Sequence, residues 1–160
     1  MLALDLQLAI EADNLPSQAD FERWVSTALT ALSQPDKAEL TIRITSNDEV
    51  QQLNRDYRGK DKPTNVLSFP FEPYEALMAY AGDAAELNLL GDIIIAHDVI
   101  VSEAQAQNKP VINHYAHMTL HGVLHLLGYD HIEDDEAQAM EALETQMLAG
   151  LGIADPYRVV

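Results

Sequence analysis

The chain has 160 residues, of which 26 are acidic, 9 are basic and none is cysteine, so its formal net charge is −17. This length predicts one domain with a real hydrophobic core, and the lack of cysteine excludes disulfides and thiolate metal ligands. The sequence has no apolar run of about 20 residues and no basic leader before an apolar stretch, so we expect a cytoplasmic protein with no membrane partner. The acidic charge taken alone argues against a nucleic-acid binder.

Apolar periodicity and turn residues divide the chain into strands and helices. In chain order the predicted elements are a strand at 2–10, a helix at 17–32, a strand at 39–45, a helix at 46–57, strands at 66–71 and 91–96, and helices at 98–108, 111–127 and 134–149. Residues 72–90 are predicted to be an excursion of a loop. This order predicts a single α+β domain over residues 1–160, with a mixed sheet of about four strands packed with helices.

Three polar residues are expected to cap helices. Ser17 with Asp20, and Ser46 with Glu49, have the spacing of capping boxes. Asp98 is expected to cap the helix that follows it. These residues predict where the first three helices begin.

Three histidines, His121, His125 and His131, have the spacing of metal ligands. The first two are four residues apart, so on a helix their imidazoles lie about 40° apart around the axis. Gly128 can end that helix in a left-handed conformation and bring His131 to the same ion. Three neutral imidazoles with an open fourth position are typical of a catalytic zinc, so we expect a metzincin-like zinc-binding helix. Alternatively, the three histidines are ordinary core or surface residues.

The spacing is that of the metzincin signature, His-Glu-x-x-His-x-x-Gly-x-x-His, with Gly122 in place of the glutamate. In those proteases the glutamate is the general base that takes a proton from water on the zinc. The sequence therefore keeps the pattern of a hydrolytic zinc site but lacks the base that peptide hydrolysis uses.

Four of the nine basic residues, Arg55, Arg58, Lys60 and Lys62, fall within eight positions. Such a run taken alone is most simply a solvated loop. Cleavage of a phosphodiester, however, needs cations that offset the charge on the phosphate oxygens, and a guanidinium pairs bidentately with phosphate. Arg58, which lies in the basic loop before a strand, is the best candidate because its guanidinium can form this bidentate pair. Together with Gly122, the basic cluster favours a phosphate ester as the substrate.

His114 and His117 lie on the same helix as His121 and His125, and all four fall within an arc of about 80°. His114 is two turns from His121, so it cannot easily join the same ligand set. It could stand along the groove as a proton donor or a phosphate contact, or it could be a packed residue without function. His117 is interpreted as a packed residue.

The acidic excess is concentrated near the C-terminal end of the chain. Its members are Glu133, Asp134, Asp135, Glu136, Glu141 and Glu144. These six residues lie far along the chain from the basic cluster, so an acidic protein with one basic patch can still bind a polyanion there.

Several stretches of the sequence together resemble the YbeY family of bacterial endoribonucleases. They are residues 54–70, with the sequence Asn-Arg-Asp-Tyr-Arg-Gly-Lys-Asp-Lys-Pro-Thr-Asn-Val-Leu-Ser-Phe-Pro, then Gly91-Asp92-Ile93, the histidine run 114–131 and the tail through 155–157. The resemblance covers nearly the whole chain, and the histidine run and the 54–70 stretch are specific motifs.

The resemblance implies a zinc-dependent, single-strand-specific endoribonuclease that acts in ribosomal RNA processing, particularly small-subunit rRNA 3′-end maturation, and in ribosome quality control. It implies one Zn²⁺ held by His121, His125 and His131, with Arg58 and His114 as catalytic residues in the cleft. It also implies a cytoplasmic protein whose partners are single-stranded ribosomal RNA, the small ribosomal subunit and assembly proteins.

Two other functions stay open on the sequence. One is a metzincin-like metallopeptidase, which the histidine spacing favours and Gly122 opposes. The other is a non-catalytic ribosome assembly factor, in which a structural zinc holds the C-terminal half together and the acidic helix binds a ribosomal protein.

Overall fold

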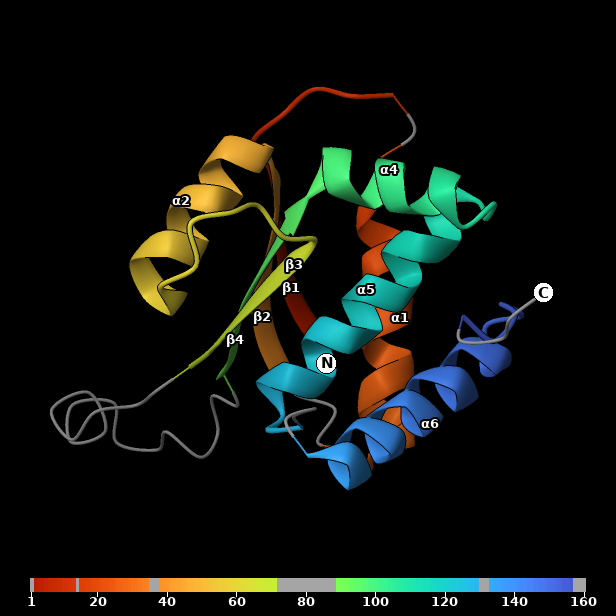
Figure 1. Ribbon diagram of the computed structural model, residues 1–160. Coiled ribbons are helices and arrows are strands. Elements are labelled where there is room, and N and C mark those ends of the chain that lie inside the picture. The colour runs from red at the N-terminus through yellow and green to blue at the C-terminus, as the bar shows by residue number, and fades with distance from the viewer. Residues whose placement is uncertain (1, 14, 35–37, 72–88, 130–132, 157–160) are drawn as a thin grey trace, which may run out of the picture.

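The apolar periodicities of the sequence correspond to nine helices and strands in the described part of the computed structural model, which comprises residues 2–13, 15–34, 38–71, 89–129 and 133–156. They are β1 (Leu2–Leu8), α1 (Gln18–Ala31), β2 (Ala38–Thr45), α2 (Asn47–Arg58), β3 (Val66–Pro70), β4 (Leu89–Ala96), α4 (His97–Ala106), α5 (Val111–Leu126) and α6 (Asp134–Gly150) (Figure 1). None of these helices is both long and apolar enough to cross a membrane. The excursion predicted at 72–90 lies outside the described residues, apart from its last two residues, which begin β4.

The four strands form one mixed sheet in the order β1-β2-β4-β3. β1, β2 and β4 are parallel, and β3 pairs antiparallel with β4. The register places Leu6, Ile42 and Ile93 side by side on one face of the sheet. The predicted α+β fold with a mixed sheet of about four strands is therefore confirmed.

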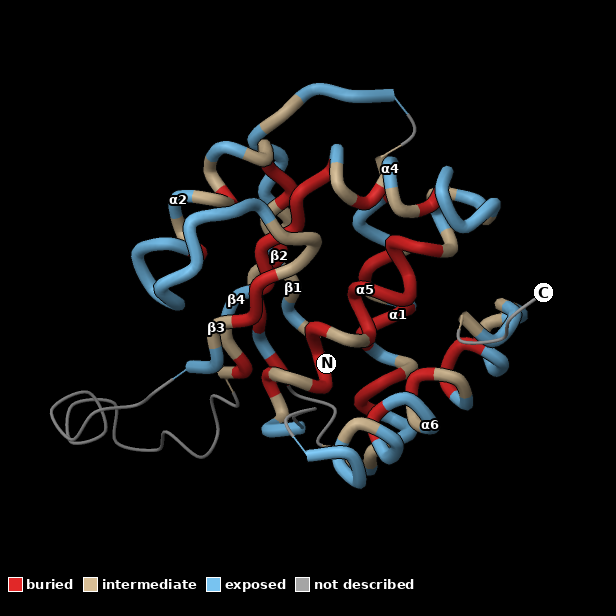
Figure 2. The backbone as a smooth tube through the Cα atoms, viewed as in Figure 1, coloured by how far each residue is buried: buried red, intermediate tan, exposed pale blue. Residues whose placement is uncertain are grey.

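Helices cover the two faces of the sheet unequally. α1 and α5 pack on the face that carries Ile42 and Ile93 and form the main core, and α6 packs against α5 and α1 (Figures 1 and 2). α2 covers part of the opposite face, where Val50 meets Leu67 and Ile94. α5 is buried along most of its length (Figure 2). The helix that carries two of the three predicted metal ligands is thus packed against the sheet and against α1, α4 and α6.

The predicted caps are confirmed at α1, half confirmed at α2 and wrong at α4. Ser17 and Asp20 form the full capping box. At α2 the Ser46 side chain accepts from the Glu49 amide, but the Glu49 carboxylate binds Arg43 instead of reaching back to Ser46. α4 begins at His97 directly after β4, so Asp98 lies inside its first turn and no side chain caps it.

A glycine allows β3 and β4 to pair closely at one end of the sheet. Gly91 has φ +133°, and an added Cβ would lie 2.2 Å from the carbonyl oxygen of Phe69 and 2.9 Å from the Cα of Pro70. Both contacts involve backbone of the neighbouring strand, so no side-chain rotation can relieve them.

Replacing Gly91 with alanine is therefore expected to lower the free energy of unfolding by about 2 to 3 kcal/mol, from backbone strain and displacement of β3. Urea denaturation followed by circular dichroism measures the change. Gly152→Ala is the control, because Gly152 also has positive φ but nothing lies within 4 Å of an added Cβ. An equal effect of the two substitutions would contradict the close approach of the strands as the cause.

Candidate functional site

Helix α5 directs two histidines of the predicted ligand set at the same point. Pro110 is its N-cap residue, and the helix then runs without interruption to Leu126. His121 and His125 lie one turn apart near its C-terminal end, where both are partly exposed. Their Nε2 atoms are 3.0 Å apart. The predicted helical spacing of these two residues, and the convergence of their rings, are confirmed.

The turn after α5 is the one that the motif predicts. Gly128 has φ +98°, a left-handed conformation that favours glycine. The amide of Gly128 donates to the carbonyl of His125 and the amide of Tyr129 donates to Leu124, which is the Schellman pattern at a helix C-terminus. The chain therefore leaves the helix abruptly beside the two histidines. The third predicted ligand, His131, lies outside the described residues.

The two imidazoles fit a zinc ion. Zinc binds imidazole nitrogen at about 2.0–2.1 Å in tetrahedral geometry, so two such nitrogens lie about 3.3 Å apart, close to the 3.0 Å between these Nε2 atoms. Within the described residues no group of three histidine, cysteine or acidic side chains forms a complete ligand set. The described residues therefore include two imidazole nitrogens whose spacing suits a zinc ion.

Packing accounts for the glycine that replaces the metzincin glutamate. An added Cβ at Gly122 would lie 3.1 Å from two carbon atoms of Ile93 and 3.3 Å from Ser68 Oγ. Ser68 also donates to the Gly122 carbonyl at 3.1 Å. Position 122 thus faces the sheet, and a larger residue there would require Ile93 and Ser68 to shift by a few tenths of an ångström. Glycine at position 122 lets α5 lie close to β3 and β4, and it supplies no general base there.

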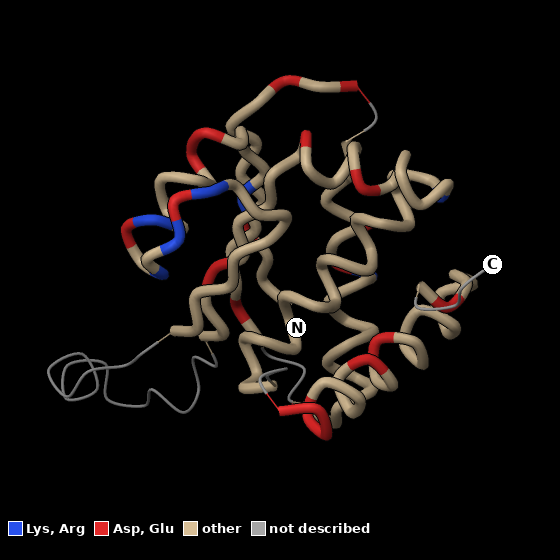
Figure 3. The backbone as a smooth tube through the Cα atoms, viewed as in Figure 1, with Lys and Arg blue, Asp and Glu red and all other residues tan. Residues whose placement is uncertain are grey.

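A cleft of about 820 Å³ joins the histidines to the basic cluster. Among its lining residues are His121 and His125 on one side and Arg58, Lys60 and Lys62 on the other. Arg58 is the last residue of α2 and its guanidinium donates to the Ser68 carbonyl at 3.1 Å. Figure 3 shows these basic residues at the end of α2 and in the loop that follows it.

Arg55 differs from the other three members of the basic cluster. It is exposed one turn earlier on α2, pairs with Asp56, and is not among the described residues that line the cleft. The structure thus brings Arg58, His121 and His125 together and leaves Arg55 outside.

His114 lies behind the cleft wall. It is 2% exposed, and its Nε2 is 2.9 Å from Glu103 Oε1. Burial lowers the pKa of His114, although the hydrogen bond with Glu103 opposes this shift. Glu103 also accepts from the side chain of Asn65, which does line the cleft. His114 is therefore connected to the cleft through two other side chains and is not among the described residues that line it.

Glu144 is a site residue that the sequence analysis missed. Along the sequence Glu144 is one of the acidic residues of the C-terminal segment, yet it is 0% exposed and contacts His117 and His121. A signal was available. Glu144 occupies the apolar stripe of α6, between Met140 and Leu148 at helical spacing, where an acidic residue is unusual.

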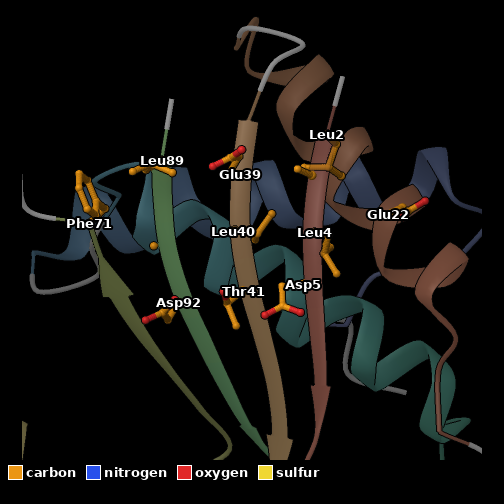
Figure 4. Close-up of a pocket in the computed structure, with 12 residues that line it drawn as sticks. Leu2, Leu4, Asp5, Glu22, Glu39, Leu40, Thr41, Phe71, Leu89 and Asp92 are labelled. Atoms are coloured by element: carbon orange, nitrogen blue, oxygen red, sulfur yellow. The ribbon is translucent and has the colours of Figure 1, made fainter. Parts of the chain in front are cut away.

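A second cavity, of about 540 Å³, is lined by residues of β1, β2 and β4 together with Glu22 of α1 and Phe71 (Figure 4). Its walls include four carboxylates, those of Asp5, Glu22, Glu39 and Asp92, and none of the described residues that line it is basic or a histidine. A phosphate would be repelled there, whereas the cleft beside His121 offers it cations. Electrostatics therefore favours the histidine-lined cleft as the candidate active site.

The chain is similar to known proteins over nearly its full length. The family model for endoribonuclease YbeY matches residues 6–152. An endoribonuclease YbeY from Chromohalobacter salexigens is 54% identical over 156 residues, which are 96% of this chain and 96% of that protein. The solution structure of TM1509 from Thermotoga maritima has the same fold, with a TM-score of 0.58 at 21% identity over 99% of this chain and 100% of that one. This chain belongs to the YbeY family of endoribonucleases.

Proposed function

We propose that the chain is a zinc-dependent endoribonuclease that cleaves single-stranded RNA. The observation that carries the proposal is that His121, His125 and Arg58 line one cleft. His121 and His125 would hold the zinc with His131 as the third ligand, as the sequence motif predicts. When bound, zinc supplies Lewis acidity and brings the pKa of water to about 7, which reduces the need for a separate strong base.

The proposed role of Arg58 is to bind the phosphate at which cleavage occurs. Its guanidinium is anchored through one nitrogen to the Ser68 carbonyl, so the remaining donors can face a phosphate in the cleft. Lys60 and Lys62 would hold neighbouring phosphates of the strand. These cations offset the charge that develops on the phosphate oxygens during attack.

The preference for single-stranded RNA is supported by an aromatic residue at the cleft. Tyr129 lines the cleft and is 36% exposed. An unpaired base can stack on an exposed aromatic ring, whereas a base inside a duplex is already stacked between its neighbours. Tyr129 therefore favours a strand whose bases are free.

For His114 we propose a positioning role. With Glu103 it holds Asn65, the residue that precedes β3 and closes the basic loop. The position of the loop determines where Lys60 and Lys62 meet the RNA, so His114 would act on the cleft through Glu103 and Asn65 without touching RNA.

The biological setting proposed for this activity rests on the family resemblance. We assign the enzyme to ribosomal RNA processing in the cytoplasm, at the 3′ end of small-subunit RNA, and to ribosome quality control, with the small subunit and its assembly proteins as partners. Deleting the gene should then cause small-subunit RNA with an unprocessed 3′ end to accumulate. An unchanged 3′ end in the deletion strain would contradict this assignment.

The zinc dependence is tested on the wild-type protein. We expect about one zinc per chain by elemental analysis, cleavage of a single-stranded RNA but not of the same sequence in a duplex, loss of cleavage after chelation, and recovery when zinc is added back. Undiminished cleavage by the metal-free protein would overturn the proposal. Metal-dependent cleavage of a peptide would favour the metallopeptidase instead.

A further inference from the structure

A buried carboxylate from α6 links two histidines of α5. Glu144 Oε1 is 2.5 Å from His121 Nδ1, and Glu144 Oε2 is 3.1 Å from His117 Nε2. The Glu144 side chain is 1% exposed and that of His117 is 7% exposed, whereas His121 reaches the cleft with 21% of its side chain exposed. Both carboxylate oxygens are therefore engaged, one with a predicted zinc ligand and one with a residue deeper in the core.

The cost of burying this charge determines how the hydrogen bonds are arranged. A buried carboxylate without partners is strongly unfavourable, so it needs hydrogen-bond donors at its oxygens. A carboxylate only accepts, so His121 Nδ1 and His117 Nε2 must both donate. His121 then carries its proton on Nδ1 and its lone pair on Nε2, the atom that faces His125 Nε2.

We propose that Glu144 is the positioning residue of the zinc site: it fixes the tautomer and the ring orientation of His121, and His117 holds the carboxylate in place from behind. This inference rests on the proposed zinc dependence. An imidazole that donates its second N–H to a carboxylate is a common support for a metal ligand, because it makes the other nitrogen available and more basic.

In this arrangement α6 also contributes to the site, through Glu144. The helix packs against α5 on the side away from the sheet, and its contribution to the site is a single side chain inserted from its apolar stripe. His117, which the sequence analysis interpreted as a packed residue, is buried as expected and also contacts Glu144.

The test replaces Glu144 with glutamine and compares it with Glu141→Gln. Glu141 is exposed one turn earlier on the same helix, so its substitution makes the same chemical change without touching a histidine. Glu144→Gln is expected to weaken zinc binding by about 10- to 100-fold, measured by competition with a chromophoric chelator. Glu141→Gln should bind zinc as the wild type does.

A second measurement on metal-free protein separates positioning from general support of the fold. Long-range ¹H–¹⁵N NMR spectra report which imidazole nitrogen carries the proton. His121 should be protonated on Nδ1 in the wild type and in Glu144→Asp, and should lose this preference in Glu144→Gln. If Glu144→Gln does not fold, Glu144→Asp must still bind zinc several-fold more weakly, because its shorter side chain cannot reach both histidines equally well.

The outcomes distinguish this inference from the proposed function. Wild-type protein that binds no zinc would overturn the zinc dependence, and the tautomer measurement would still decide whether Glu144 orients His121. Tight zinc binding by the wild type with equal affinity and an unchanged His121 tautomer in Glu144→Gln would overturn the inference and leave the proposed function intact.

Discussion

Replacing His121 or His125 with alanine is expected to remove the bound zinc and to lower cleavage of single-stranded RNA by about 1,000-fold or more. Their Nε2 atoms face each other at 3.0 Å, so the loss of either leaves the ion without one of two adjacent ligands. Metal activation lowers the free energy of the transition state by several kcal/mol, and about 4 kcal/mol corresponds to a 1,000-fold change in rate. Elemental analysis and a single-turnover cleavage assay measure the two effects.

Of the two substitutions, His125→Ala is the cleaner experiment. His121 also donates to the buried Glu144, so His121→Ala removes one of its hydrogen-bond donors and is expected to lower the melting temperature of the metal-free protein. Asn113→Ala serves as the control, because Asn113 lies two turns before His121 on the same helix and lines a different cavity. Retention of both zinc and cleavage in His125→Ala would show that the converging histidines are not the metal site.

Replacing Arg58 with alanine is expected to lower kcat/KM for RNA by about 100-fold while the zinc content stays the same. The loss follows from removing a cation that stabilises charge on the phosphate oxygens in the transition state, an interaction whose deletion typically costs 100- to 1,000-fold. Because Arg58 is exposed, the melting temperature should change little. Arg58→Lys should recover only part of the rate, since an ammonium cannot form the bidentate pair.

Arg55→Ala is the matched control for this prediction. Arg55 has the same charge, lies on the same helix and is exposed, but it does not line the cleft with Arg58. Replacing Arg55 should lower the cleavage rate by less than about threefold, because it weakens only the general electrostatic attraction between the protein and RNA. Loss of zinc in Arg58→Ala, or equal effects of the two substitutions, would contradict the role assigned to Arg58.

Local sequence signals predicted the parts of this protein that depend on local interactions. The alternation of β1 and β2, the Ser17 capping box and the Gly128 turn each involve residues close together in the chain, and each is present in the structure. The relative position of His121 and His125 is also local, because a four-residue separation on a helix fixes the relative direction of two side chains. The family resemblance then supplied RNA as the expected substrate.

Contacts between distant segments account for what the sequence analysis missed. Glu49 has capping-box spacing, but Arg43 on β2 takes its carboxylate. For His114 the sequence left a place along the groove and a packed position both open, and the contacts of His114 with Glu103, and of Glu103 with Asn65, come from residues on other elements. The hydrogen bond between Glu144 and His121 joins two helices and residues 23 positions apart. The periodicity of apolar residues along one helix cannot predict such a contact.

Spacing along the chain and backbone preference were enough to predict the element order, the helix end at Gly128, the two histidines on one helix face and the basic loop. Tertiary packing was needed to show that the basic loop and the histidines share a cleft, that position 122 packs tightly against Ile93 and Ser68, and that Glu144 contacts His121. These features arise where α5 packs against the sheet and α6. Close packing there determines which side chains contact one another.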